Sequence, residues 1–161
     1  MKNDKIVAIA MSYVGQTEIK GNQGFKDKAF EKKMVAVGFN KGDAWCAYFA
    51  ELVWKEGGQE SKTFSASAWI TAMKFQAAGY EWSGVPVPGA LVVYRSFKNG
   101  KPLATGHIGI VTEVTADGFK SVEGNTSASG SREGTLVGLR EHSFRWSENN
   151  GLRLMGFVYP K

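Results

Sequence analysis

The stretch His107–Asn125, HIGIVTEVTADGFKSVEGN, predicts the feature that decides the fold, an antiparallel β-hairpin. Its two halves are rich in Val, Ile and Phe, which favour strands. The dipeptide Asp117-Gly118 lies between the halves and is a strong signal for a tight turn. A turn at this point places His107 opposite residues 123–128, in a register that the sequence alone leaves open. We therefore expect the second half of the chain to form an antiparallel sheet.

The rest of the chain divides into helical sequence before the hairpin and mostly β sequence around it. Apolar residues at helical spacing predict a first amphipathic helix over Ile6–Val14, with Asn3 or Asp4 as its N-cap. Three more helices are expected, over Phe25–Val37, Trp45–Glu56 and Ser65–Ala78. Strands are expected over Gly89–Arg95, His107–Val114, Phe119–Glu123 and Leu152–Tyr159, with a weaker pattern over Leu136–Phe144 and a Gly/Ser-rich loop over Gly124–Gly134. This order predicts an α+β fold, with N-terminal helices packed on a C-terminal antiparallel β-sheet.

Length and charge restrict the class of protein. With 161 residues, of which 43% are hydrophobic and 22% charged, we expect a single globular domain over residues 1–161. The net charge of +5 suits anionic partners. The basic residues are scattered and form no Lys/Arg run, so we expect no nucleic-acid partner. The apolar run Ile6–Met11 is too short for a signal peptide, and no apolar stretch is long enough to span a membrane. We therefore expect synthesis in the cytoplasm without a signal peptide, and no stable membrane insertion.

Cys46 is the single cysteine of the chain, so it cannot form a disulfide within it. If Asp43 is the N-cap of the expected helix, Cys46 is the third helical residue and lies in the first turn. Unpaired backbone N–H groups and the helix dipole favour the thiolate at this place, and the thiolate is the nucleophilic form. The alternative is a buried core cysteine, because Ala47, Phe49 and Val53 are its helical neighbours.

The hairpin places polar residues where a Cys–His enzyme needs them. It brings His107 beside Glu123, Asn125 or both, since residues two apart on a strand share a face. An imidazole can remove the proton of a thiol and later protonate a leaving amine. A carboxylate such as Glu123 can hold the imidazole in one orientation and stabilise its charged form. The alternatives are a structural histidine, a solvent-facing Glu123 and a turn role for Asn125.

Four segments occur in an order and at spacings typical of a known family: Asp43–Phe49 (DAWCAYF), Pro88–Tyr94 (PGALVVY), Gly106–Val111 (GHIGIV) and Val122–Thr126 (VEGNT). Together they resemble the CHAP domain, the cysteine, histidine-dependent amidohydrolase/peptidase family of the NlpC/P60-like, papain-like superfamily. Upstream, Gly15–Glu18 and Gly21–Gly24 resemble the family's N-terminal Gly-x-x-Glu and Gly-Asn-rich segments. The resemblance covers nearly the whole chain and implies a papain-like fold.

The resemblance also implies a role for each polar residue. Cys46 would be the nucleophile, His107 the general base, Glu123 the residue that orients the imidazole, and Asn125 a fourth polar member of the site. Family members cleave amide bonds of bacterial peptidoglycan. The bond is either the one between N-acetylmuramic acid and L-alanine or one within the stem peptide or cross-bridge, and the sequence does not distinguish them.

The sequence also predicts substrate contacts and the metal requirement. Trp45 and Tyr94, together with the loop Gly124–Gly134, are expected to line a substrate groove, with core packing as the alternative for Trp45. Some phage members of the family bind calcium through Asp residues just before the cysteine. Here the segment Gly38–Asp43 offers a single Asp, which supplies too few oxygen ligands for Ca²⁺. We therefore expect no metal and no cofactor.

Bacterial peptidoglycan is the partner that the resemblance implies. We expect a monomeric phage lysin that acts at the cell wall or periplasm after release or delivery. Three alternatives stay open. An injected amidase effector of a secretion system would have an immunity protein as a partner, and a non-enzymatic wall-binding phage component would keep the fold without the reaction. A basic nucleic-acid-binding domain rests on the net charge alone.

Overall fold

The structure is a computed structural model that describes residues 1–126, 134–144 and 151–161. Within these ranges, helices occupy the first half of the chain and strands the second. The helices are α1 Lys2–Ser12, α2 Lys28–Ala36, α3 Cys46–Glu56 and α4 Ala68–Ala77. The strands are β1 Trp82–Ser83, β2 Leu91–Lys98, β3 Lys101–Val114, β4 Gly118–Thr126, β5 Leu136–Ser143 and β6 Gly151–Val158.

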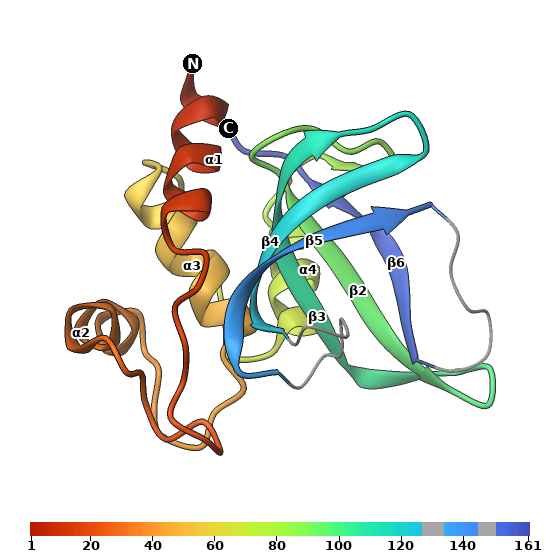
Figure 1. Ribbon diagram of the computed structural model, residues 1–161. Helices are drawn as coiled ribbons and strands as arrows, with labels where there is room; N and C mark the ends of the chain where they lie inside the picture. The colour runs from red at the N-terminus through yellow and green to blue at the C-terminus, as the bar shows by residue number, and fades with distance from the viewer. Residues whose placement is uncertain (127–133, 145–150) are drawn as a thin grey trace.

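The strands form one antiparallel sheet in the order β1-β6-β2-β3-β4-β5. The sheet is strongly curved, and α1, α2 and α3 lie together on one side of it (Figure 1). α3 packs against β3 and β4, and α4 packs against β2 and β3. The expected papain-like α+β fold, with N-terminal helices packed on an antiparallel sheet, is confirmed.

The hairpin between β3 and β4 forms as the sequence predicts. Ile110 pairs with Val122, and Val114 pairs with Phe119. β3 is nevertheless longer than expected, because it begins at Lys101 rather than at His107.

A second hairpin, between β2 and β3, explains this difference. Its turn residues Asn99 and Gly100 have φ values of 50° and 72°. Positive φ at both central residues is the backbone of a type I′ turn, and Asn-Gly is the dipeptide that favours it most. The expected strands Gly89–Arg95 and His107–Val114 are therefore too short at this end. The short strand β1, which pairs with β6, was not expected either.

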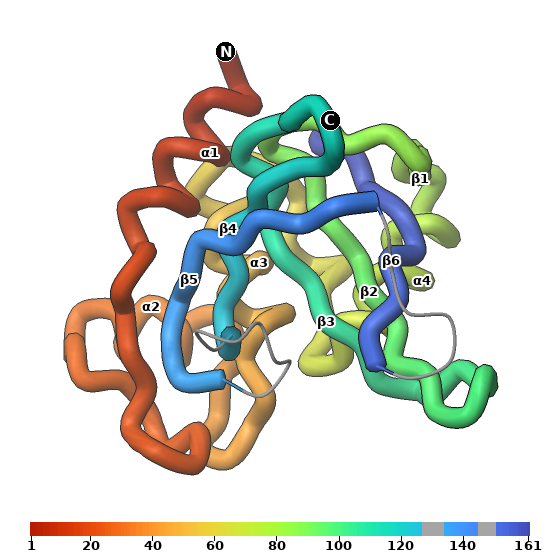
Figure 2. Tube along the Cα trace, turned by 45° about the vertical axis from the view of Figure 1, so that its right-hand side comes forward, coloured from red at the N-terminus to blue at the C-terminus, as the bar shows by residue number. Residues whose placement is uncertain are grey.

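α1 begins earlier than expected. Its N-cap is Met1 and it covers Lys2–Ser12, so neither of the two expected N-cap residues holds that position. Nζ of Lys2 donates a hydrogen bond to the backbone oxygen of Lys161 at 3.0 Å. The two chain termini thus lie near each other at the same end of the molecule (Figure 2).

Side-chain caps set the first residues of α2 and α4. The carboxylate of Asp27 accepts hydrogen bonds from the N–H groups of Ala29 and Phe30 at 2.8 and 3.2 Å. The hydroxyl of Ser67 accepts one from the N–H of Ile70 at 3.3 Å. Each helix begins directly after its cap, which is later than expected, because a capping oxygen satisfies first-turn donors.

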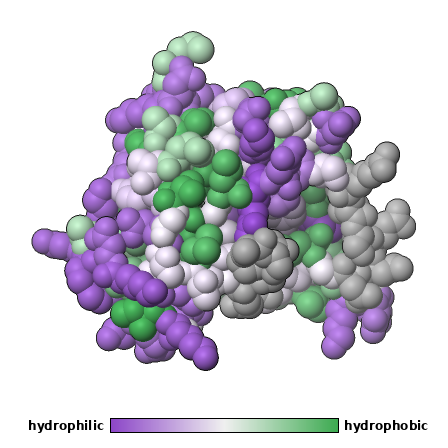
Figure 3. All heavy atoms as spheres, viewed as in Figure 1, coloured by the Kyte–Doolittle hydropathy of each residue, from purple (hydrophilic) through white to green (hydrophobic). Residues whose placement is uncertain are grey.

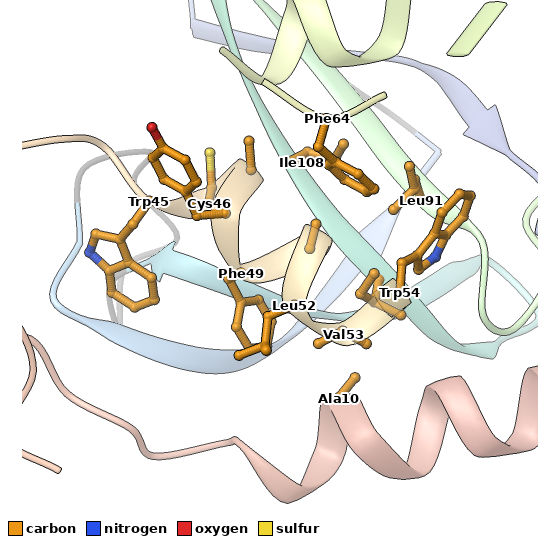
Figure 4. Packing of buried hydrophobic residues seen from close by; sticks show 14 of the residues in the cluster. Ala10, Trp45, Cys46, Phe49, Leu52, Val53, Trp54, Phe64, Leu91 and Ile108 are labelled. Atoms are coloured by element: carbon orange, nitrogen blue, oxygen red, sulfur yellow. The ribbon is translucent and has the colours of Figure 1, made fainter. Parts of the chain in front are cut away.

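Two hydrophobic clusters lie on the two faces of the sheet. The larger one lies between helices and sheet and includes Phe49, Val53 and Trp54 of α3 (Figure 4). Successive strand residues alternate between the clusters: Leu91 belongs to the larger one and Val92 to the smaller one on the other face. This alternation determines which polar residues of β3 and β4 can meet.

Polar side chains cover much of the surface seen in Figure 3, and apolar side chains gather where α1 meets the sheet. Met11 and Leu139 line a shallow cavity of about 230 Å³ at this place. Among the described residues, no helix combines the length and the apolar character that crossing a membrane requires.

Candidate active site

Cys46 is the first residue of α3, and the N-cap is Trp45 rather than the expected Asp43. The carboxylate of Asp43 is engaged in the preceding turn, where it accepts hydrogen bonds from the N–H of Asn40 at 3.1 Å and the hydroxyl of Tyr48 at 3.2 Å. Cys46 therefore moves from the expected third helical position to the first. In the described part of the chain no side chain caps α3. Its first-turn N–H groups and the positive end of its dipole therefore remain close to the thiol.

The thiol of Cys46 borders a cavity. Cys46 is 6% exposed, and it lines a hollow of about 270 Å³. Figure 4 shows the sulfur directed away from Phe49 and Leu52. Cys46 thus lies at the edge of the core with its sulfur on the side away from these apolar side chains. The other residues along the cavity are small or polar: Ala44, Ala66, Ser67, Ala68, Thr105, Gly106 and Asn125.

Close packing of α3 on β4 fixes the position of Cys46. A Cβ atom on Gly124 would lie 2.6 Å from Cβ of Phe49 and 2.9 Å from Cζ3 of Trp45, so the helix approaches β4 only because residue 124 has no side chain. Trp45 is fully buried, and its Nε1–H donates to Oε2 of Glu18 at 2.7 Å. Trp45 therefore packs in the core, which was the alternative for it, and the expected groove role is wrong because the indole has no exposed surface.

β3 and β4 bring His107 and Glu123 together, as the hairpin predicts. Nε2 of His107 lies 2.9 Å from Oε2 of Glu123, and these side chains are 2% and 4% exposed. A Cβ atom on Gly109 would lie 2.6 Å from Cγ of Glu123, so this glycine leaves room for the carboxylate. Nδ1 of His107 is buried and has no hydrogen-bond partner of regular geometry among the described residues. It is the ring nitrogen left for Cys46, which interacts with this imidazole.

Charge and burial oppose each other at this pair. Burial lowers the pKa of His107, but the charges of Cys46 and Glu123 and hydrogen bonds to them outweigh burial and raise that pKa to about 10. Burial raises the pKa of Glu123, but the charge of His107 and its hydrogen bond, with those of His142, hold it well below its usual range. Glu123 is therefore ionised and His107 protonated at neutral pH, which places a positive charge beside Cys46.

Sequence reasoning missed two further groups at Glu123. Oγ of Ser121 donates to Oε1 of Glu123 at 2.6 Å, and Nε2 of His142 lies 2.6 Å from the same oxygen. Ser121 precedes Glu123 by two residues on β4, and the rule that such residues share a face could have found it. His142 lies on β5, whose pairing with β4 across a long connection has no signal in the sequence.

Asn125 lies near the end of β4 and lines the cavity beside Cys46. It is 1% exposed, and its Oδ1 has no hydrogen-bond partner among the described residues. Its φ of 53° is in the left-handed region, which Asn tolerates better than most residues. Glu123, and not Asn125, contacts Nε2 of His107, so the amide of Asn125 is available to the cavity.

Tyr94 is not among the residues that line the cavity at Cys46, and only part of the expected loop lies within the described residues. Tyr94 pairs with His107 across β2 and β3, and its ring centroid lies 6.4 Å from that of the imidazole. It is buried, and burial followed by the charge of Glu123 raises its pKa well above the usual value. Tyr94 therefore supports the imidazole from the interior and does not line the cavity at Cys46, which corrects the expected groove role. Of the expected loop Gly124–Gly134, the first residues belong to β4, and residues 127–133 lie outside the described residues.

The described ranges 1–126, 134–144 and 151–161 contain no group of three or more His, Cys, Asp or Glu side chains that could hold a metal ion. The carboxylate of Asp43, the one acidic residue just before the cysteine, already accepts hydrogen bonds from Asn40 and Tyr48.

The four polar residues lie within one family match. The family model described as CHAP domain matches residues 38–125, which is more than half of the 161 residues. This range contains Cys46, His107, Glu123 and Asn125. No curated protein and no solved structure matches the chain.

Proposed function

The chain belongs to the CHAP family, and on this premise we propose that it hydrolyses an amide bond of bacterial peptidoglycan with Cys46 as the nucleophile. The observation that carries the proposal is the sequence of contacts from Cys46 to His107 to Glu123, with Cys46 at the border of a cavity. A nucleophile, a base beside it and a third group that orients the base are the parts that thiol-dependent acyl transfer requires.

The reaction begins from the charged pair of Cys46 and His107. The thiolate attacks the scissile carbonyl carbon, and the C=O electron pair moves onto the oxygen. Protonated His107 then gives its Nδ1 proton to the amide nitrogen, the C–N bond breaks, and the amine leaves while the acyl group stays on sulfur as a thioester.

Water completes the cycle. The imidazole of His107, now neutral, takes a proton from a water molecule whose oxygen attacks the thioester carbon. The C–S bond breaks, the acid is released, and the thiolate and imidazolium are restored. Glu123 stays ionised throughout and stabilises the imidazolium each time it forms.

The negative charge that develops on the carbonyl oxygen needs donors. The N–H of Cys46 belongs to the uncapped first turn of α3, where backbone donors are not used within the helix. Asn125 adds a buried side-chain amide on the same cavity. We assign both to the oxyanion, because donors fixed before the reaction stabilise this charge most effectively.

The small residues that line the cavity would let the backbone of a substrate lie close to the protein. Ala44, Ala66 and Gly106 contribute little side-chain bulk to its walls, and none of the described residues that line it is Asp, Glu, Lys or Arg. The proposal covers the bond to the L-alanine end of a muramoyl peptide as well as a stem-peptide or cross-bridge bond, so amidase and endopeptidase are two forms of it. The net charge of +5 favours approach to an anionic envelope, and a phage lysin that acts as a monomer remains the proposed biological role.

Product analysis tests the proposal. Purified sacculi are incubated with the protein, and the soluble fragments are examined by mass spectrometry and by labelling of new amino groups. New amino groups in equal number to new carboxyl groups are expected, and the fragment masses identify the bond. Binding to sacculi without any new amino group would overturn the proposal and favour the non-enzymatic wall-binding alternative. A phage lysin and an injected effector would be distinguished by a specific complex with an immunity protein.

A further inference from the structure

The carboxylate of Glu123 uses its two oxygens for different partners. Oε2 faces Nε2 of His107 at 2.9 Å. Oε1 faces Oγ of Ser121 and Nε2 of His142, both at 2.6 Å. Because an ionised carboxylate can only accept hydrogen bonds, all three partners donate. The tautomer of His142 therefore carries a proton on Nε2.

Aromatic neighbours hold the imidazole of His142 in place. It is paired with Phe119 across β5 and β4, and its ring centroid lies 5.2 Å from that of Phe119. On another side Tyr94 of β2 lies 5.4 Å away, centroid to centroid. The side chain of His142 is 25% exposed, whereas that of Glu123 is 4% exposed. The imidazole thus connects the buried carboxylate with the surface.

His142 lies away from the reacting groups. The cavity that Cys46 lines does not include His142, Ser121 or Glu123 among its lining residues. Any influence of His142 on the thiol therefore passes through Glu123 and then His107. The order along this connection is His142, Glu123, His107 and Cys46.

We propose that His142 is a positioning residue: its Nε2–H, together with Oγ of Ser121, fixes the carboxylate of Glu123 so that Oε2 stays on His107. A glutamate side chain has three rotatable bonds, and a hydrogen bond to one oxygen alone would let the other rotate away. Two donors on Oε1 prevent this rotation. The proposal rests on the Cys46–His107 pair of the proposed function but not on the identity of the substrate.

Two substitutions of His142 test whether the N–H donor at the place of Nε2, rather than the imidazole ring itself, is required. In His142→Gln the side-chain amide nitrogen can occupy the place of Nε2 and still donate to Glu123. In His142→Asn the amide nitrogen matches the place of Nδ1 and falls short of Glu123. Ser121→Ala removes the second donor with little change in volume, since only the hydroxyl is lost, at a position that is fully buried.

The readout is alkylation of Cys46 by iodoacetamide as a function of pH, which needs no peptidoglycan and reports one site because the chain has one cysteine. Loss of the donor is expected to lower the alkylation rate at neutral pH about tenfold, the effect of one lost hydrogen bond to a charged group. It should also shift the alkaline pH dependence, which follows deprotonation of His107, to lower pH, because a displaced carboxylate stabilises the imidazolium less.

We expect His142→Asn and Ser121→Ala to show both effects and His142→Gln to stay close to the unmodified protein, with all variants folded by circular dichroism. An unchanged pH profile in both His142→Asn and Ser121→Ala would overturn the proposal. So would a loss in His142→Gln as large as in His142→Asn. If the variants shift the alkylation profile as expected but the unmodified protein releases no amino groups from sacculi, the proposed function is contradicted and the positioning role stays intact.

Discussion

Oε2 of Glu123 lies 2.9 Å from Nε2 of His107, and neither side chain is more than 4% exposed. An ion pair that is closed off from water is weakly screened, so each partner strongly affects the charge of the other. Removing one of them leaves the second buried without its counter-charge.

Glu123→Gln keeps the shape of the side chain and removes its charge. The charge of Glu123 is one cause of the raised pKa of His107, so this pKa should fall. We expect kcat/KM on sacculi or on wall fragments to drop by on the order of 10²-fold, a typical contribution of general acid–base groups. The descending alkaline limb of its pH profile should also move to lower pH. A pH profile of Glu123→Gln whose two limbs lie at the same pH as in the unmodified protein would contradict the role given to Glu123.

Stability should depend on pH through His107. Its pKa rises from 6.5 to about 10 on folding, so its protonated form stabilises the folded state at low pH, and this contribution is lost as the pH rises from 6.5 to about 10. Chemical denaturation should show the free energy of unfolding falling over this range. In His107→Gln, which keeps a donor for Glu123 but does not titrate, this part of the fall should disappear. An equal pH dependence in both proteins would show that His107 is not the group responsible.

Gly124→Ala should displace α3 from β4. The added Cβ would lie 2.6 Å from Cβ of Phe49, and such overpacking costs about 1–3 kcal/mol. Because the same contact sets the place of Cys46, the alkylation rate of the thiol should change as well. Gly84→Ala is the matched control, since nothing lies within 4 Å of a Cβ atom there and its φ is ordinary. Thermal unfolding of the two variants is the measurement, and equal midpoints would contradict the packing argument.

Trp45→Phe should destabilise the protein through Glu18. It removes the Nε1–H that donates to the buried carboxylate at 2.7 Å and leaves that carboxylate without this donor. A loss of about 1–3 kcal/mol in the free energy of unfolding is expected. The double variant with Glu18→Leu should regain part of it, because removing both partners leaves no buried polar group without a hydrogen bond. If the double variant is the sum of the two single ones, the two side chains are not coupled.

The fold was predictable from the sequence because its main signals are local. The hairpin from His107 to Asn125 carries its own turn residues and strand pattern, and the structure follows it. The expected helix over Trp45–Glu56 also forms, but with Trp45 as its N-cap. Helix caps depend on which side-chain oxygens are already engaged, and the hydrogen bonds of Asp43 with Asn40 and Tyr48 are a tertiary property that a residue pattern does not contain.

The site was predictable where one hairpin contains it. His107 and Glu123 meet because they belong to adjacent strands joined by a short turn, which fixes their approximate register. His142 was missed because β5 follows β4 after a long connection, so a shift of one residue would have turned it to the other face. Trp45 and Tyr94, the residues expected in a groove, are both buried, and core packing was the stated alternative for Trp45.

Digestion of purified sacculi by the unmodified protein and by Cys46→Ala, with new amino groups counted over time, tests the central claim most directly. Cys46→Ser provides a second variant of nearly the same size, and circular dichroism confirms that both variants are folded. The account predicts that the unmodified protein releases fragments with new amino groups and that both variants release at least about 10³-fold fewer, since no nucleophile of comparable strength remains. Undiminished release by a folded Cys46→Ala would contradict it.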